Sequence, residues 1–326
     1  MNYNISSNFS KDGTIVDICL GASYFLYSPS SSYISHITAV CVVSALFSVV
    51  GIFLNSLVLY IFWKSPTMRS KMSYFTIMVL SSIDLSVVAI VLPLSSLELL
   101  NKILFLTTPN CVYTVFIYLA GCIFCGMSVS TLFTINIERY FSIVRPILHR
   151  TMLTKGRFLL ICGFSWLVVP LTIISQVLSS IVGLFVISVV LFIVCSTSLF
   201  VYFSIFLFAR KRLRNLNTSG NKHDENSSKI LQSFLRELKM AKTYVLIVSL
   251  SFICYLPYGV SVIYYDIGGS VAGQKVKWEK GIPAWTSALL QINSTLNCFV
   301  FFWMNRELRK EGSKIVKKYF RTRDGR

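Results

Sequence analysis

Residues 158–208 read FLLICGFSWLVVPLTIISQVLSSIVGLFVISVVLFIVCSTSLFVYFSIFLF and contain no charged side chain. As a single α-helix rising about 1.5 Å per residue, this segment would be about 76 Å long, over twice the thickness of a bilayer's hydrocarbon core. It must therefore fold back once. Gln176, Ser179 and Ser180 are its most polar point and follow Pro170, so we expect a very short outer loop there between two spanning helices.

The rest of the chain contains further apolar segments long enough to cross a bilayer. The composition is 54% hydrophobic and 13% charged, whereas soluble domains carry about 25% charged residues. The sequence therefore predicts an all-α membrane protein, a bundle of seven transmembrane helices, and argues against a soluble enzyme. The predicted spans are residues 38–63, 72–97, 111–137, 158–175, 181–208, 240–265 and 282–304.

The distribution of charge predicts the orientation of the chain. It has 31 Lys and Arg against 13 Asp and Glu, and 25 of the 31 lie in the first, second and third loops of one side and in the tail. Because basic residues accumulate in cytoplasmic loops, we expect the N-terminus outside the plasma membrane and the tail inside. Topology accounts for the net charge of +18, so no nucleic-acid partner is needed.

This orientation divides the chain into an extracellular segment (1–37), the seven-span domain (38–304) and a cytoplasmic helix with its tail (305–326). Residues 305–319 have the pattern of a short amphipathic eighth helix, with apolar residues toward lipid and basic residues toward lipid phosphates. Asn4 and Asn8 stand in glycosylation sequons on the expected outer side.

One ionisable side chain, Asp84, lies in the middle of a predicted span. An ionised group is costly at that depth, so Asp84 is protonated, tied to a neighbouring helix, or part of a functional site. Asn293 and Asn297 share one face of the last span because they are four residues apart. With Ser128 and Ser294 they offer oxygen atoms to a hard cation such as Na⁺, although such residues also form ordinary hydrogen bonds between helices.

Glu138-Arg139-Tyr140 stands at the inner end of the third span. An arginine at this place satisfies the positive-inside rule without any further role. Its guanidinium can also pair with Glu138 on the same helix or with Glu237, just before the sixth span. The first pair lies within one helix and the second joins two helices. An arginine that exchanges between them would act as a two-state switch.

Six motifs occur in order along the spans: Gly51-Ile-Phe-Leu-Asn55, Asp84, Glu138-Arg139-Tyr140, Trp166, Cys254-Tyr-Leu-Pro257 and Asn293-Ser-Thr-Leu-Asn297. In this order the chain resembles rhodopsin-like (class A) G-protein-coupled receptors over residues 49–320. Its short second outer loop and lack of a fifth-span proline are loosely similar to the melanocortin, adenosine and cannabinoid-related branch. Pro257 removes a backbone donor and predicts a kink in the sixth span.

The resemblance implies a receptor that binds an extracellular ligand and activates a heterotrimeric G protein as the sixth helix moves outward. It implies that Arg139 gates coupling, that Tyr202 is the inner tyrosine of the fifth span, and that Pro146 and Ile147 lie in the loop that touches the G protein. It also implies an allosteric Na⁺ pocket, with no other cofactor, formed by Asp84, Ser128, Asn293, Ser294 and Asn297.

The chain departs from the family pattern at several positions. Tyr255 replaces the sixth-span tryptophan, and Asn297-Cys298-Phe-Val-Phe301 lacks the usual proline and tyrosine. The family's disulfide joins the third span to the second outer loop, which has no cysteine here. Cys19 is the best outside partner for Cys111, although Cys111 can equally remain a buried free thiol.

Residues at the family's ligand positions argue against two ligand classes. Gly121 stands where amine receptors carry an aspartate, which disfavours a biogenic amine, and Gln291 replaces the lysine that binds retinal. Glu98 and Asp266 near the outer mouth are suited to a cation, or are solvated charges. A small-molecule, lipid-like or peptide ligand remains open, in an expected pocket of Glu98, Tyr118, Gly121, Cys122, Cys125, Val186, Val190, Tyr255, Asp266, Trp285 and Gln291.

Two other protein classes are weaker alternatives. A seven-span transporter or channel would line a continuous path with polar or charged residues, but Asp84 alone is ionisable at mid-depth. An enzyme is not expected, because His36, His149 and His223 lie far apart and no nucleophile–base pair stands out.

Overall fold

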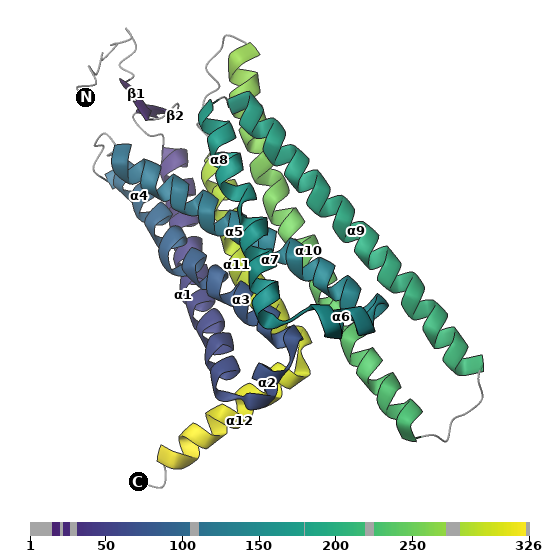
Figure 1. Cartoon of the computed structure of the whole chain (residues 1–326). Coiled ribbons are helices and arrows are strands. Elements are labelled where there is room, and N and C mark those ends of the chain that lie inside the picture. The colour runs from purple at the N-terminus through teal and green to yellow at the C-terminus, as the bar shows by residue number, and fades with distance from the viewer. Residues whose placement is uncertain are drawn as a thin grey trace.

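The computed structural model describes residues 15–19, 22–26, 31–104, 111–178, 180–218, 225–271 and 281–323, and its helices form one elongated bundle (Figure 1). In chain order the helices are α1 (Ser31–Lys64), α2 (Pro66–Ser70), α3 (Met72–Ser86), the π-helical η1 (Val87–Val91), α4 (Leu92–Leu104), α5 (Cys111–Val144), α6 (Pro146–Met152), α7 (Lys155–Trp166), α8 (Val168–Leu178), α9 (Ser180–Thr218), α10 (Glu225–Val271), α11 (Ile282–Met304) and α12 (Arg306–Arg323).

Seven helical segments run along the bundle, which confirms the predicted architecture. Six of them are long and apolar enough to cross a membrane: α1, α3 continued through α4, α5, α7 continued into α8, α9 and α10. The seventh, α11, has 23 residues, enough for about 30 Å at about 1.5 Å per residue. Its lower apolarity comes from a buried polar face that includes Gln291, Asn293 and Asn297.

Two helix breaks follow from prolines. Pro170 cannot accept the regular helix geometry without a clash at the carbonyl of Trp166, four residues earlier, and α7 ends at Trp166. Pro93 stands in the same relation to Ala89, where the chain widens into the η1 π-helix. The predicted reversal after Pro170 is confirmed, because α8 ends at Leu178 and α9 begins at Ser180.

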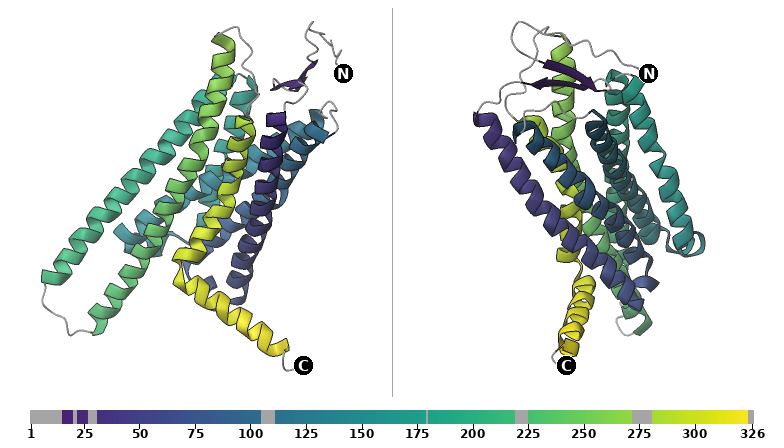
Figure 2. Two further views of the ribbon diagram at one scale, coloured as in Figure 1. Left: turned by 180° about the vertical axis from the view of Figure 1, so that it is seen from behind. Right: turned by 90° about the vertical axis from the view of Figure 1, so that its left-hand side faces the viewer.

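A two-stranded antiparallel hairpin adds to the expected all-helical bundle. Strand β1 (Ile15–Cys19) pairs with β2 (Ala22–Leu26), with Ile15 opposite Leu26. The hairpin lies beyond the end of the bundle opposite α12, as all views show (Figures 1 and 2). The first and last elements therefore lie at opposite ends, as an odd number of crossings requires.

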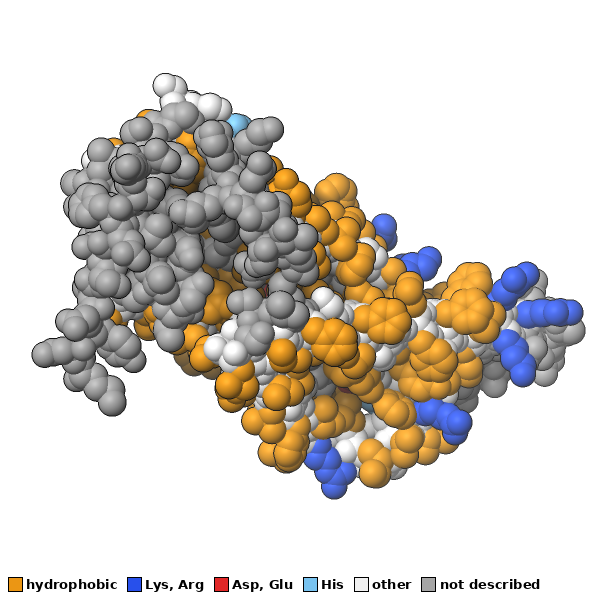
Figure 3. Space-filling model, turned by 90° about the horizontal axis from the view of Figure 1, so that it is seen from above, with side chains coloured by type: hydrophobic (Ala, Val, Ile, Leu, Met, Phe, Trp, Pro, Cys, Tyr) orange, Lys and Arg blue, Asp and Glu red, His pale blue; other side chains and the backbone are white. Residues whose placement is uncertain are grey.

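The bundle is apolar outside as well as inside. Large hydrophobic side chains on its flanks are strongly exposed, among them Phe53 (65%), Phe164 (72%) and Phe192 (72%). Seen from the hairpin end, hydrophobic side chains cover the visible flanks, and the visible Lys and Arg lie toward the periphery (Figure 3). A surface of this kind suits lipid rather than water. The largest buried cluster lies around Leu80 and Ile135, among the helices that carry the site described next.

Candidate functional site

The inner end of α5 carries a buried ion pair. Arg139 is fully buried, and its guanidinium contacts the carboxylate of Glu138 on the same helix. It also donates to Ser73 Oγ of α3 at 2.8 Å. Because an unpaired buried charge is costly, this pairing holds Arg139 against α3 and α5. The local pairing expected from the sequence, between Arg139 and Glu138, is therefore present.

The segment directly after α5 contacts the same carboxylate, that of Glu138. Arg145 interrupts the helix, and Pro146 starts α6 at the first helical position, where its missing N–H has no cost. One turn later, His149 Nε2 lies 2.7 Å from Glu138 Oε1. Ile147, on the same short helix, is 80% exposed. Pro146 is exposed as well. Helix α6 therefore presents Pro146 and Ile147 at the surface, while His149 on the same helix contacts Glu138.

Arg139 has a further neighbour that sequence inspection missed. The ring of Tyr244, on α10, lies under the guanidinium at 5.4 Å from its carbon to the ring centroid. No sequence motif marks Ser73, His149 or Tyr244, because contacts between helices depend on how the helices are rotated rather than on spacing along one helix. Glu237 belongs to α10, but its side chain lies outside the described residues.

Tyr202 and Tyr140, also expected at the coupling site, are engaged elsewhere. The Tyr202 hydroxyl, on α9, donates to Asn136 Oδ1 of α5 at 2.7 Å, and Asn136 Nδ2 donates to Ser198 Oγ at 3.0 Å. These bonds fix α9 to α5 one turn above Arg139. Tyr140 is half-buried and packs edge-on against Phe141.

The polar centre of the bundle gathers around Asp84, which is 1% exposed. Its carboxylate accepts from Ser128 Oγ at 2.8 Å and from Asn297 Nδ2 at 3.0 Å. Ser294 also interacts with this carboxyl. In the described part of the chain, no ion pair joins Asp84 to a basic side chain. Four of the five predicted pocket residues therefore meet at one carboxylate.

Asn293, the fifth, is buried but has no hydrogen bond on either side-chain polar atom within the described residues, and Asn297 Oδ1 is likewise unpaired. Buried amide groups normally have partners, because an unmade hydrogen bond costs about 1–3 kcal/mol. The centre of the bundle thus holds a buried acid and, among the described residues, buried asparagine oxygens without hydrogen bonds.

Toward the hairpin end, the expected ligand residues form separate contacts. Tyr255 of α10 donates to the backbone carbonyl of Cys125 at 3.3 Å, and Gln291 Nε2 donates to Ser95 Oγ at 3.2 Å. Gln291 Oε1 is buried with no partner among the described residues. Glu98 accepts from Thr114 at 3.1 Å.

The remaining expected pocket residues are spread over several helices. Tyr118 is exposed and bonds to Gln176 of α8, and Trp285 packs with a cluster between α1, α4 and α11. A side chain at Gly121 would begin 3.6 Å from Val91, an ordinary contact distance. The side chain of Asp266 lies outside the described residues. Three further expected residues are half-buried: Cys122, Val186 and Val190.

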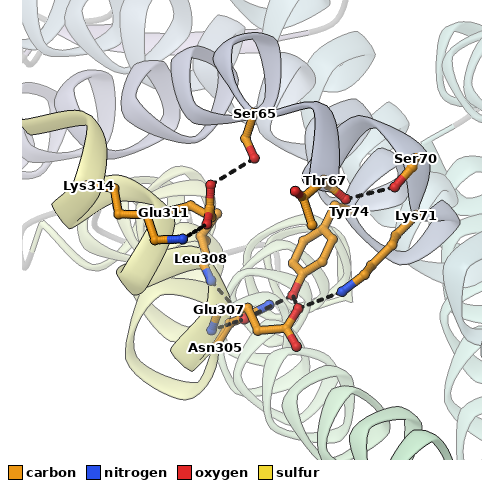
Figure 4. A network of polar contacts seen from close by, with 10 residues as sticks. All are labelled: Ser65, Thr67, Ser70, Lys71, Tyr74, Asn305, Glu307, Leu308, Glu311 and Lys314. Atoms are coloured by element: carbon orange, nitrogen blue, oxygen red, sulfur yellow. Dashed lines mark hydrogen bonds and ion pairs between the residues drawn. The ribbon is translucent and has the colours of Figure 1, made fainter. Parts of the chain in front are cut away.

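The junction between α11 and α12 is held by a polar network that sequence inspection did not identify (Figure 4). Glu307 accepts from Lys71 Nζ at 2.8 Å and from the Tyr74 hydroxyl at 2.9 Å. Glu311 accepts from Ser65 at 2.9 Å and from Lys314 at 2.8 Å. The hydrogen bond from Lys314 is the largest influence that lowers the pKa of Glu311. Two acidic residues thus dock α12 onto the ends of α1 and α3.

Asn305 caps α12, since its Oδ1 accepts from the backbone N–H groups of Glu307 and Leu308, both at 3.1 Å. Asn305→Ala is expected to destabilise the first turn of α12 by about 1 kcal/mol. Hydrogen exchange should show faster exchange of the amides at 306–310. Asn305→Ser, which retains a capping oxygen, is the matched control, and equal exchange in both variants would contradict the capping role.

Comparisons with known proteins bear on the family and the fold. Residues 54–182 match the family model "7 transmembrane receptor (rhodopsin family)", and residues 179–318 match "Serpentine type 7TM GPCR chemoreceptor Srv". Squid rhodopsin has a similar structure, with a TM-score of 0.71, 17% identity, and coverage of 90% of this chain and 88% of that one. The fold is therefore that of rhodopsin.

Two curated relatives are similar in sequence over part of their length. The histamine H2 receptor of Cavia porcellus is 24% identical over 57% of this chain and 54% of its own length. Cannabinoid receptor 1 of Xenopus laevis is 24% identical over 88% of this chain and 63% of its own length. The chain thus spans between half and two thirds of these relatives.

Proposed function

The chain belongs to the rhodopsin-like family of seven-transmembrane receptors, and from that membership we propose that it activates a heterotrimeric G protein when an extracellular ligand binds. The family is one of receptors rather than enzymes, and its members are multi-pass proteins of the plasma membrane. The observation that carries the proposal is the buried Glu138–Arg139 pair, which α10 covers at the inner end of α5.

The proposed mechanism is a shift between two preexisting arrangements of α10. In the closed arrangement, α10 packs over Arg139. Outward movement of α10 would uncover the guanidinium and open a space bounded by α5, α9 and α10. The exposed Ile147 on α6 would then supply an apolar contact for the G protein beside that space. We include in this proposal that Arg139 pairs with Glu237 in the closed arrangement and that this pair breaks when α10 moves outward.

We also propose that Asp84 is the centre of an allosteric Na⁺ site. The donor set fits, because within the part of the chain that the structure describes the buried Asp84 carboxylate has no basic partner, and oxygens of Asn293 and Asn297 lie buried without hydrogen bonds in the same bundle. Asp84, Ser128, Ser294 and the two asparagines would hold the ion, which supplies the positive charge that the carboxylate otherwise lacks. By neutralising Asp84, the site would favour the closed arrangement.

For the ligand, we propose a small or lipid-like molecule, with a peptide as the remaining alternative. Its site would lie near the hairpin end between α5, α9, α10 and α11, lined mainly by apolar and thiol side chains. The unpaired Gln291 Oε1 would accept a hydrogen bond from it. Gly121 offers no carboxylate to an ammonium group, so the similarity to a histamine receptor does not extend to its ligand.

The hairpin suggests how the outer face is held together. β1, which ends at Cys19, contacts α5, which begins at Cys111. Both side chains, and the sequons at Asn4 and Asn8, lie outside the described residues. We propose a Cys19–Cys111 disulfide on the extracellular side. Digestion of protein purified from cell surfaces under non-reducing conditions is expected to give the cross-linked peptide pair, and alkylation of Cys111 without prior reduction would contradict the bond.

The direct test of function is guanine-nucleotide exchange by the purified chain, reconstituted in lipid nanodiscs with several G proteins and a panel of small molecules, lipids and peptides. At least one combination is expected to accelerate exchange. Ion flux through liposomes that contain the chain but no G protein, with no exchange on any G protein, would instead support a channel or transporter.

A further inference from the structure

One side chain of α10, Tyr244, connects that helix to three others. It is fully buried. Its hydroxyl oxygen lies 3.0 Å from Thr76 Oγ1 of α3, and its ring lies under the Arg139 guanidinium of α5. A third contact is with the Phe301 ring of α11, edge-on at 74° and 5.4 Å between centroids. Movement of α10 away from the bundle must break all three contacts.

The direction of the Tyr244–Thr76 hydrogen bond follows from counting protons. Thr76 Oγ1 also lies 2.9 Å from the backbone carbonyl of Ser73, which can only accept. A threonine hydroxyl has one proton, so Thr76 donates it to Ser73 and accepts from Tyr244. The phenol is therefore the donor, and it depends on Thr76 for this bond, whereas Thr76 retains a partner without the phenol.

We propose that Tyr244 is a positioning residue that holds α10 over Arg139, and that Thr76 makes this position possible by accepting the hydrogen bond of the buried phenol. The effect on signalling rests on the proposed function, but the effect on α10 does not. The ring shields the guanidinium and packs on Phe301, which stands where the family carries a tyrosine. The hydroxyl closes the contact to α3.

The donor direction leads to an unequal effect of the two variants that remove this bond. Thr76→Val removes the acceptor of this hydrogen bond from the buried phenol of Tyr244 in the closed arrangement, while in the open arrangement the phenol can reach water at the inner face. The open fraction is expected to rise about tenfold. Tyr244→Phe removes the donor itself and leaves Thr76 bonded to Ser73, so the open fraction should change by about twofold or less.

The double variant gives the sharpest distinction. Because Tyr244→Phe removes the phenol that loses its bond to position 76, adding it to Thr76→Val should return the open fraction to that of Tyr244→Phe alone. Two independent structural defects would instead add. Thr76→Ser, which keeps the hydroxyl, should resemble the unmodified chain. Ser82→Ala, on the same helix, is the matched control, since that hydroxyl bonds within its own helix to Met78.

The open fraction can be measured without ligand or G protein. Spin labels attached through non-natural amino acids at Leu235 of α10 and Arg150 of α6, both exposed, report their separation by pulsed dipolar spectroscopy. Thr76→Val is expected to increase a long-distance population about tenfold, and the double variant to remove the increase. An unchanged distribution in Thr76→Val, or an additive increase in the double variant, would overturn the proposal.

Nucleotide exchange measured on the same variants separates the two proposals. If distances change as expected but no G protein responds, the role of Tyr244 stands and the proposed coupling fails. If exchange occurs and the distances do not follow this order, coupling stands and the role of Tyr244 is wrong. Should Thr76→Val not fold, the comparison of Thr76→Ala, Thr76→Ser and Thr76→Ala with Tyr244→Phe carries the same expectations.

Discussion

Arg139→Ala is expected to reduce receptor-stimulated nucleotide exchange to the level of membranes without the receptor, while the amount at the cell surface stays near normal. In the proposed mechanism, movement of α10 uncovers this guanidinium for the G protein, so its removal would take that contact away. Folding should persist, because Glu138 keeps a partner in His149 at 2.7 Å. Exchange with purified G protein and surface labelling of a tagged chain measure the two quantities.

Arg139→Lys is the control for charge. It keeps a positive group but loses the planar fork that reaches both Glu138 and Ser73, so an intermediate loss is expected. Exchange by Arg139→Ala equal to that of the unmodified chain, at equal surface amounts, would contradict the assignment of Arg139 as the switch.

Asp84→Asn is expected to abolish stabilisation of the purified receptor by Na⁺. The substitution keeps the size of the side chain and one acceptor oxygen, but it replaces the other oxygen with an amide donor and removes the charge that would attract the ion. In the unmodified chain, Na⁺ at ten times its dissociation constant would stabilise the folded state by about 1.4 kcal/mol. The measurement is the thermal unfolding midpoint in NaCl against choline chloride at equal ionic strength.

Glu98→Gln is the matched control for the Na⁺ experiment. It removes a partly buried carboxylate that is bonded to Thr114 on α5, far along the chain from the asparagines of α11. It should keep the Na⁺ response of the unmodified chain. A response that survives in Asp84→Asn, or one that both variants lose, would contradict a site centred on Asp84.

The sequence was sufficient to predict the helices, because the hydropathy of a segment and the effect of a proline on a helix are local properties. The charge-free run at 158–208 predicted its reversal, and Pro170 marks the break near it. The hairpin was missed although a signal was present. Its strands, IVDIC and ASYFL, are rich in β-branched and aromatic residues on either side of Leu20-Gly21, a pattern typical of a tight turn.

The site was predictable only where spacing along one helix decides it. The four-residue separation of Asn293 and Asn297 placed both on the buried face of α11. Spacing could not show that Asn297 reaches Asp84 while Asn293 has no hydrogen-bond partner among the described residues. Ser73 and Tyr244 were missed because their contacts with Arg139 depend on how α3 and α10 are rotated in the bundle. Such rotation follows from packing of whole helices.

The measurement closest to the central claim is the separation of the inner ends of α10 and α6 while a G protein is bound. Labels at Leu235 and Arg150 would be measured on the reconstituted chain, alone and with a G protein from which nucleotide has been removed. The expected result is a new, longer distance that appears with the G protein and disappears when nucleotide is restored. A stable complex with an unchanged distance would contradict outward movement of α10 from Arg139.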